Sequence, residues 1–368
     1  LTDLARAAPG LVVSDAGPGE RRISLRGIRS AGEAQVAVYY DEAPLTGPPG
    51  ASSDAGRSQG GLQMFDVERV EVLRGPQGTL YGASSMGGTL RIIYKKPSDI
   101  LEAAVDVTGS VTDHAGDNYQ LNAMVNVPIA GDALGIRAVA WRYQSAGWID
   151  NPRLDAEKIN KNESEGVRLL LGARPADWLD LDFGVHYSRE KGQDPVWAPS
   201  LGKFISPNTI NLPTRDKNRL YTATARADLG FANLVATGSL QDRDQLYFRD
   251  PYYLMQLARG NRGFCARHSG PAVCATPEGM TDYNAYVDSL LPMGYIYTQE
   301  MKNYSSEVRL QSHEGGILDW TIGGYWSKRS SKMWSNGQLA DSHGILLENA
   351  PYVYARRVHD DLSQIAGF

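Results

Sequence analysis

The sequence predicts an antiparallel transmembrane β-barrel, present here as about ten strands, that follows an N-terminal region of shorter strands. Three observations predict this fold. Apolar and polar residues alternate in runs of about ten residues after Pro97, tight turns and long connections follow one another along the chain, and tryptophan and tyrosine gather near the ends of the runs. Each of these is a property of β-barrels that cross a membrane.

The composition of the 368-residue chain agrees with β-structure. It contains 19 tyrosines, 7 tryptophans and 39 glycines, and aromatic residues with frequent glycine suit folds built from short strands. The formal net charge of −5 gives no sign of the concentrated basic face of a nucleic-acid binder, so we expect no nucleic acid as a partner. No run of about 18 apolar residues occurs, and the sequence therefore predicts no membrane-spanning helix.

The alternation is clearest in "DWLDLDFGVHYS", residues 177–188. Residues 118–129 and 305–312 repeat it. A period of two with one apolar and one hydrated face is the pattern of a half-buried strand. In residues 177–188 one face carries Leu179, Leu181, Phe183, Val185 and Tyr187, and the other carries Asp180, Asp182, Gly184, His186 and Ser188.

A soluble sandwich would also alternate, so connection length is the second argument. Short turns and long connections alternate along the chain. The short turns lie at 130–133, 175–177, 230–232 and 314–316, and the long connections at 145–163, 191–217, 243–302 and 331–358. Transmembrane barrels have short turns at one rim and long loops at the other. The long connections show no helical periodicity, and structureless loops of such length are unusual in compact soluble domains.

Aromatic placement is the third argument. In transmembrane barrels, amphipathic aromatic rings are enriched at the strand ends, where the barrel meets the membrane–water interface. The alternative is that these tryptophans belong to the core of a soluble sandwich. The residues in question are Trp141, Tyr143, Trp148, Trp320 and Trp326.

The region before Pro97 has a different character, with short strand-like runs and the glycine-rich stretch "RGPQGTLYGASSMGG", residues 74–88. A nucleotide-binding loop needs a Lys-Ser/Thr pair after its last glycine, at the start of a helix. Here Gly88 is followed by Thr89, Leu90 and Arg91, which favour a strand. The glycines therefore predict compact loops and close backbone packing rather than a phosphate site.

Residues 67–97, "VERVEVLRGPQGTLYGASSMGGTLRIIYKKP", resemble the end of the plug domain of TonB-dependent outer-membrane receptors. "ISLRGIRS" at 23–30 and "VAVYYDEAPL" at 36–45 are similar to the earlier half of that plug, and "NYSSEVRLQS" and "LDWTIGGYWSK" resemble barrel strands of the family. One departure is Tyr40–Asp41–Glu42, where the family usually has Val-Asp-Gly, and we expect that change to cost little.

The resemblance implies two domains. Residues 1–97 would form an α+β plug without its N-terminal coupling segment, and residues 98–368 would form the first half of a barrel, because plugged transporters of this type have about 22 strands. An open sheet with a lipid face leaves unpaired edges that a membrane does not tolerate. We therefore expect residues 1–368 alone not to be functional.

The resemblance also implies contacts between plug and barrel. Arg26 and Arg74 each end a strand-like run and precede a glycine. On this hypothesis they face carboxylates of the barrel wall, and Glu307 is the candidate carboxylate. The alternative is that both are ordinary surface arginines. Such pairs are directional and fix two bodies in register, although their net stabilisation is often small.

The long connections carry aromatic residues that are candidates for capturing an extracellular ligand, although packing of the loops against one another explains them equally well. The ligand candidates are Tyr247, Tyr252, Tyr253 and Tyr286. Cys265 and Cys274 lie in the same connection, and we expect them to form the disulfide of an exported loop, with two unpaired thiols as the alternative.

No arrangement of residues predicts catalysis or a cofactor. The six histidines are scattered without the spacing of metal ligands, and no serine elbow or cysteine–histidine pattern occurs. Asp180 and Asp182 lie on one strand face, which a hydrated lumen wall explains. We expect neither an enzyme nor a metal site.

The resemblance implies an energy-coupled receptor of the bacterial outer membrane that imports a scarce nutrient such as a ferric siderophore. The expected partners are the inner-membrane TonB complex, outer-membrane lipid and an extracellular siderophore, cobalamin or saccharide. A passive porin is the first alternative, and it would lack residues 1–97. A soluble β-rich ligand-binding protein is the second.

Overall fold

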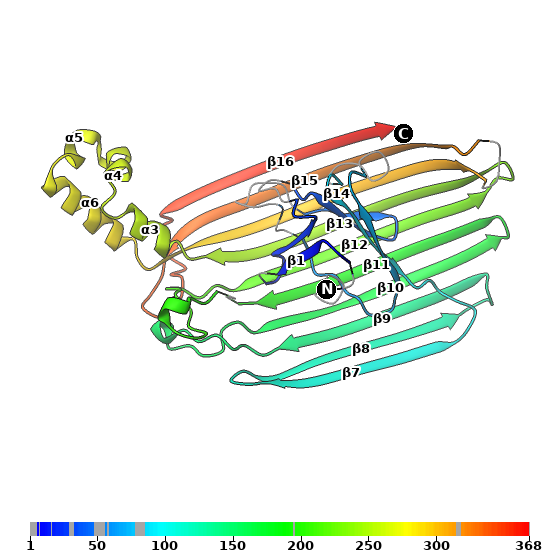
Figure 1. Ribbon diagram of the computed structural model, residues 1–368, viewed down its shortest axis with the longest axis horizontal. Helices are drawn as coiled ribbons and strands as arrows, with labels where there is room; N and C mark the ends of the chain where they lie inside the picture. The colour runs from blue at the N-terminus through cyan, green and yellow to red at the C-terminus, as the bar shows by residue number, and fades with distance from the viewer. Residues whose placement is uncertain are drawn as a thin grey trace.

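A computed structural model describes residues 6, 8–15, 17–28, 33–47, 56, 59–77, 85–193, 196–313 and 318–367. Ten long strands form one curved sheet, and a small domain of six short strands lies against its concave face (Figure 1). We call the small domain the plug and the large sheet the wall.

The wall is an antiparallel meander in which every strand pairs with its neighbours in sequence, from β7 at one edge to β16 at the other. This confirms the predicted partial barrel of about ten strands. The strands are β7 (Glu102–Thr112), β8 (Gly116–Pro128), β9 (Leu134–Ser145), β10 (Asn162–Ala176), β11 (Leu179–Gly192), β12 (Thr214–Asp228), β13 (Ala232–Arg249), β14 (Met293–Ser312), β15 (Thr321–Leu339) and β16 (Tyr354–Gly367).

The connections between the wall strands alternate as predicted. Those after β8, β10, β12 and β14 are short and lie at one end of the sheet, whereas those after β9, β11, β13 and β15 are long and lie at the other (Figure 1). Two of the long connections include a single 3-10 turn, Pro152–Leu154 and Pro199–Leu201. In transmembrane barrels the long connections are extracellular.

The longest connection corrects the sequence analysis, which expected no helix between residues 243 and 302. It holds α3 (Tyr252–Ala258), α4 (Arg262–Ser269), α5 (Pro271–Cys274) and α6 (Pro277–Ser289), which project from the end of the sheet (Figure 1). The helices are too short for a clear 3.6-residue period, but Asn261 and Thr276 cap two of them. Among the described residues, no helix has both the length and the apolar character that crossing a bilayer requires.

The two faces of the wall differ as the alternation predicted. On β8, Leu121, Val125 and Val127 are 39–45% exposed on the convex face, while Asn122 and Asn126 are at most 1% exposed on the concave face. On β11, Phe183 and Val185 are exposed and His186 is buried. Along these stretches of β8 and β11 the convex face is therefore apolar and exposed, and the concave face is polar and buried.

The plug contains a two-stranded and a four-stranded sheet. Strands β1 (Leu11–Asp15) and β2 (Arg21–Leu25) pair with each other, and β4 (Ala43–Leu45), β3 (Val36–Tyr40), β6 (Gly88–Tyr94) and β5 (Val67–Arg74) form a mixed sheet in which β3 and β6 are parallel. The two sheets share a core of Leu11, Ile23, Leu25, Val36, Val38 and Leu90. The predicted domain boundary after Pro97 falls between the end of β6 and the start of β7, and it stays a prediction.

Candidate functional site: the contact between plug and wall

A buried carboxylate of the plug is held by two arginines of the wall. Asp66, in the turn before β5, accepts two hydrogen bonds from Arg137 of β9, at 2.8 Å from Nε and 2.6 Å from Nη2. Arg168 of β10 donates a third from Nη2 at 3.1 Å. The side chains of Asp66, Arg137 and Arg168 are only 3%, 2% and 1% exposed. We call these three residues the Asp66 clamp.

Arg168 joins the clamp to an aromatic cluster. Its guanidinium lies 3.7 Å from the centre of the Tyr94 ring, at the end of β6, and Tyr94 packs on Tyr40 and on His186 of the wall. Burial raises the pKa of both tyrosines, so their hydroxyls stay neutral. A cation over an aromatic face is attracted by the ring quadrupole, most strongly where water is excluded.

A second buried ion pair holds the two-stranded sheet of the plug. Arg21 of β2 contacts Glu190 of β11 at 2.7 Å, and both side chains are less than 10% exposed. Arg21 also contacts Asp15 at 2.7 Å. Burial on its own would lower the pKa of Arg21, but Glu190 and Asp15 outweigh it and the pKa is raised, so the guanidinium stays charged.

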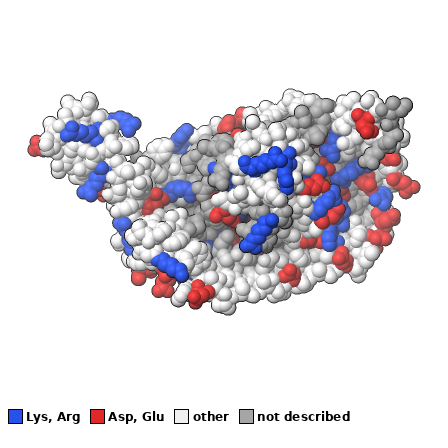
Figure 2. Space-filling model, viewed as in Figure 1, with Lys and Arg blue, Asp and Glu red and all other residues white. Residues whose placement is uncertain are grey.

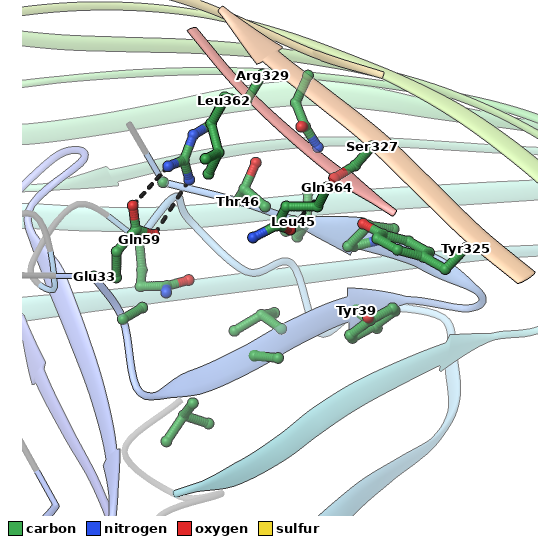
Figure 3. Close-up of a pocket in the computed structure, with 17 residues that line it drawn as sticks. Glu33, Tyr39, Leu45, Thr46, Gln59, Tyr325, Ser327, Arg329, Leu362 and Gln364 are labelled. Atoms are coloured by element: carbon green, nitrogen blue, oxygen red, sulfur yellow. Dashed lines mark hydrogen bonds and ion pairs between the residues drawn. The ribbon is translucent and has the colours of Figure 1, made fainter. Parts of the chain in front are cut away.

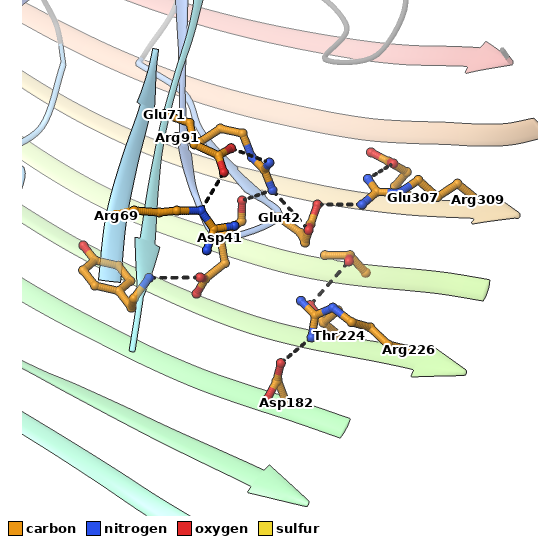
Figure 4. Close-up of polar contacts among 12 residues, drawn as sticks. Asp41, Glu42, Arg69, Glu71, Arg91, Asp182, Thr224, Arg226, Glu307 and Arg309 are labelled. Carbon is orange, nitrogen blue, oxygen red and sulfur yellow. Dashed lines mark hydrogen bonds and ion pairs between the residues drawn. The ribbon is translucent and has the colours of Figure 1, made fainter. Parts of the chain in front are cut away.

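A more hydrated chain of charges lies nearer the short turns (Figure 4). Glu42 of the plug accepts from Arg309 of β14 at 3.2 Å and from Arg91 of β6 at 3.2 Å. Arg91 also contacts Glu71 at 2.9 Å, and Arg309 contacts Glu307 at 3.0 Å. Figure 2 shows basic and acidic side chains interspersed over this part of the visible face rather than separated into patches.

Lys96 forms a further bridge beside this chain of charges. Its ammonium lies 3.2 Å from Asp41 of the plug and 3.5 Å from Asp182 of β11. Burial raises the pKa of Asp41 and Lys96 opposes that effect. The plug is thus tied to strands β9, β10, β11 and β14 by charged side chains.

The structure does not bring the three predicted contact residues together. Arg26 lies in the turn after β2 and Arg74 is the last residue of β5; both are exposed, and in the described part of the chain neither forms an ion pair with Glu307. Glu307 lies on the wall as expected, but its cation is Arg309, two residues along on the same face. The plug reaches this pair through Glu42, one of the residues at which the chain departs from the family pattern.

The four predicted ligand residues also lie apart. Tyr247 is on the concave face of β13, Tyr252 and Tyr253 are on α3, and Tyr286 is on α6, where it stacks on His268 at 4.1 Å. Tyr253 is 74% exposed, whereas Tyr247 is 8% exposed. Of the four, Tyr247 alone lies on a wall strand.

Tyr247 belongs to a row that the sequence analysis missed. Its ring stacks on Tyr297 of β14 at 4.8 Å, the two residues being direct cross-strand partners. Tyr295 and Tyr354 extend the contact toward β16, at 6.5 Å and 6.0 Å between ring centres. Arg249 lies 4.9 Å above the Tyr247 ring and pairs with Glu20 of the plug. We call Tyr247, Tyr295, Tyr297 and Tyr354 the tyrosine row. Alignment of the strands could have found it, since Tyr247 pairs with Tyr297 while Tyr295 and Tyr354 both pair with Gly337 of β15.

Cys265 of α4 and Cys274 of α5 are joined by a disulfide. Both are buried, and they pack with Tyr283 and Val287 of α6 in a core of their own. The helices of this connection are therefore held together by a small apolar core and a covalent link.

A small cavity lies between the plug strands β3 and β4 and the wall strands β14 to β16 (Figure 3). Glu33 of the plug crosses its edge to Arg329 of β15, at 2.6 Å and 3.2 Å. The accessible space is about 50 Å³, room for one or two water molecules. At this place the plug and the wall leave little room between them.

In the described ranges, no group of three or more His, Cys, Asp or Glu side chains is placed to hold a metal ion.

The comparisons with known proteins follow the same division into plug and wall. Residues 1–89 match the family model described as the TonB-dependent Receptor Plug Domain. The chain is 30% identical over 193 residues to the pesticin receptor of Yersinia pestis, an alignment covering 51% of the chain and 26% of that protein. It is 31% identical over 245 residues to the ferripyoverdine receptor of Pseudomonas aeruginosa, covering 63% of the chain and 28% of that protein.

Solved structures share the fold over the whole chain. The ferric citrate transporter FecA in its unliganded form matches with a TM-score of 0.72 at 11% identity, over 100% of this chain and 56% of its own. The ferric yersiniabactin receptor FyuA from Yersinia pestis matches with a TM-score of 0.60 at 16% identity, over 99% of this chain and 58% of its own. The chain thus corresponds to little more than half of each solved receptor and aligns with about a quarter of each curated relative.

The family match covers the plug, and the solved structures share the fold of plug and wall together. The buried contacts between plug and wall agree with that arrangement. The chain therefore has a plug domain of the TonB-dependent receptor family, and its plug and ten-stranded wall share the fold of outer-membrane receptors of that family.

Proposed function

We propose that the protein imports a ferric siderophore across the outer membrane, with energy from the inner-membrane TonB complex. The observation that carries the proposal is the plug fastened to the concave face by buried ion pairs. Breaking one buried pair costs about 3–5 kcal/mol, because it leaves an unpaired charge away from water. A plug held by several such pairs does not leave its place spontaneously, so import needs work.

Binding of a ligand can do only part of that work. It shifts the plug between two arrangements by no more than its difference in affinity for them. The remainder is assigned to a force applied to the plug by the inner-membrane complex. The small cavity beside Glu33 and Arg329 supports this, since it leaves little room between plug and wall at that place.

The tyrosine row supports the choice of ligand. It lies on the concave face at the end of the long connections, beside Arg249 and the plug residue Glu20. Phenol rings supply flat apolar area with a polar edge, and an arginine adds affinity for anionic groups. An anionic, partly aromatic iron chelate fits such a surface, and the related proteins are named for pesticin, ferric enterobactin and ferripyoverdine.

The test is uptake of radiolabelled candidates by the bacterium that makes the receptor: siderophores loaded with radioactive iron, cobalamin labelled with radioactive cobalt, and maltooligosaccharides labelled with radioactive carbon. We expect saturable uptake of at least one ferric siderophore that disappears when the gene is deleted and when a protonophore removes the proton motive force. Uptake of cobalamin or a saccharide in its place would overturn the choice of cargo. Gene-dependent uptake that survives the protonophore would instead favour a passive channel.

A pair of variants locates the ligand site in the same assay. Tyr297→Ala removes a member of the tyrosine row, and we expect the half-saturating ligand concentration to rise about tenfold or more, as for a buried aromatic anchor. Tyr253→Ala, an exposed tyrosine of α3, is the matched control and is expected to leave uptake unchanged. Equal effects of the two variants would contradict the proposed site.

A further inference from the structure

The segment that joins the plug to the wall crosses the wall near the short turns. It lies between the end of β6 and the start of β7. Lys96 contacts Asp182 of β11, Pro97 lies on β9 and β10, and Ser98 is bound to β8. The segment therefore meets four wall strands in order before it enters β7. We call residues 96–100 the strap.

Two glycines of the wall form a notch for Pro97. Gly135 of β9 and Gly172 of β10 are direct cross-strand partners. A Cβ on Gly135 would lie 3.1 Å from Pro97 Cβ, and a Cβ on Gly172 would lie 3.4 Å from Pro97 Cγ. The first distance is tighter than an ordinary van der Waals contact, so a side chain on Gly135 would push the proline away from the sheet. Glycine at both positions lets the strap lie directly on the wall.

The side chain of Asn126 on β8 is given over to the strap. Its Oδ1 accepts a hydrogen bond from the amide of Ser98 at 3.1 Å, and its Nδ2 donates to the carbonyls of Ser98 at 3.0 Å and Ile100 at 2.7 Å. Asn126 is 0% exposed, so its carboxamide is shielded from water. A carboxamide has two N–H donors and one acceptor oxygen, and here all of them bind the strap. Losing these bonds would leave buried polar groups unpaired, which is costly.

The ion pair that joins Lys96 to the plug is partly exposed. The Lys96 ammonium lies 3.2 Å from Asp41 of the plug, and the lysine side chain is 33% exposed. Exposed pairs contribute little to stability. Because Asp182 of the wall lies 3.5 Å from the same ammonium, Lys96 keeps a partner when Asp41 moves away. Lys95, just before the strap, is exposed, and in the described part of the chain it forms no ion pair.

From this geometry we infer that the strap belongs to the wall and stays bound to β8, β9 and β10 when the plug leaves its place. Lys95 is then the hinge, since a hinge is a residue at the end of an element that can turn without breaking contacts. Displacement of the plug would therefore turn about its C-terminal end. The use of this motion in import rests on the proposed function, whereas the binding of the strap to the wall does not.

The test uses two cross-links of the same chemistry, made by a short reagent with two methanethiosulfonate groups. S98C/N126C joins the strap to β8, and T46C/Q241C joins the plug to β13, where the amide of Thr46 donates to Gln241 at 3.0 Å. The purified receptor is titrated with urea, and a brief pulse of protease reports release of the plug by cleavage within residues 1–94. A cross-link stabilises only when it joins points that separate on release. Compared with the same variant before reaction, linked T46C/Q241C should need about 1 M more urea, and linked S98C/N126C should release its plug as before.

Hydrogen exchange of the purified receptor gives a second readout. In N126A the amide of Ser98 should exchange about tenfold faster or more, because the hydrogen bond that protects it is lost. N122A is the matched control: Asn122 lies two residues away on the same face of β8 and is 1% exposed, and in the described part of the chain it makes no hydrogen bond to the strap. It should leave the exchange at Ser98 unchanged, and unheated samples of both variants should run in gels as folded barrels.

Two results would overturn the inference. One is that both cross-links move the urea midpoint alike, because the strap would then behave as the rest of the plug does. The other is unaltered exchange at Ser98 in folded N126A. Neither measurement uses a cargo, so a failure of import in the uptake assay is distinguishable from a failure of the strap.

Discussion

Asp66→Ala is expected to make the receptor leaky. The substitution removes the carboxylate from the Asp66 clamp and leaves Arg168 buried, with backbone carbonyls and the Tyr94 ring in place of an anion. Arg137 keeps Glu102 at 3.1 Å, on the more exposed side of the clamp. Breaking a buried pair costs about 3–5 kcal/mol, which shifts the equilibrium between docked and undocked plug by roughly 150- to 5000-fold.

The measurement for Asp66→Ala is ionic conductance of the purified receptor in planar bilayers, supported by sensitivity of the living cells to a large antibiotic that the outer membrane excludes. Asp66→Asn keeps the shape and one acceptor oxygen, so its conductance should be intermediate. Glu68→Ala removes a nearby carboxylate that pairs with Arg69 on the exposed side of β5, and it should remain as closed as the unaltered receptor. If Asp66→Ala were equally closed, the clamp would not hold the plug.

Gly88→Val is expected to unfold the four-stranded sheet of the plug. Gly88 has φ +141°, and a Cβ there would lie 2.3 Å from the carbonyl oxygen of Leu73 and 2.6 Å from Leu25 Cδ1. It begins β6 and pairs with Arg74 on one side and Val36 on the other. Backbone strain and overpacking together cost about 2–6 kcal/mol, a large share of the stability of a small domain.

Limited proteolysis of the purified receptor measures this effect. Gly88→Val should expose sites within residues 1–97 to cleavage, while the wall resists. Gly75→Val is the matched control, because Gly75 also has a positive φ, +91°, but no atom within 4 Å of its Cβ position. Gly75→Val carries the backbone strain of a positive φ without the steric clash. It should therefore be cleaved far more slowly than Gly88→Val. Equal resistance of Gly88→Val and the unaltered receptor would show that close packing is not the role of this glycine.

The sheet could be predicted because its cause is local. A strand places alternate side chains on opposite faces, so the contrast between Leu121 and Asn122, or between Val185 and His186, is present in the sequence without knowledge of the partner strand. The number of strands and the alternation of short and long connections follow from the same runs.

The contacts between plug and wall could not be predicted in the same way. Asp66 meets Arg137 and Arg168 across 71 and 102 residues of chain, and their meeting depends on the register of three strands and on the seating of the plug. Glu42 was noticed as a turn substitution, but its role appears only where Arg91 and Arg309 approach it from two different sheets. Arg26 and Arg74 are exposed, and in the described part of the chain neither forms an ion pair with Glu307.

The helices between β13 and β14 were missed for a different reason. Each has at most 13 residues, and their core includes the two cysteines joined by the disulfide. Much of their stability therefore comes from contacts made between helices rather than from a pattern within one helix. Asn261 and Thr276 are N-cap residues, which mark where a helix begins. In a sequence they are weak evidence for a helix unless apolar residues recur every three or four positions after them.

The division of the wall into a lipid face and a plug face is the claim on which the other proposals depend. Nitroxide labels placed one at a time on residues 181–187 of β11, in the receptor within its membrane, test it by collision rates with dissolved oxygen and with a water-soluble nickel complex. We expect oxygen collisions to peak at 181, 183, 185 and 187 and to fall at 182, 184 and 186. Labels at 183 and 185 shielded from both reagents would contradict the account, because they would show those side chains packed against protein.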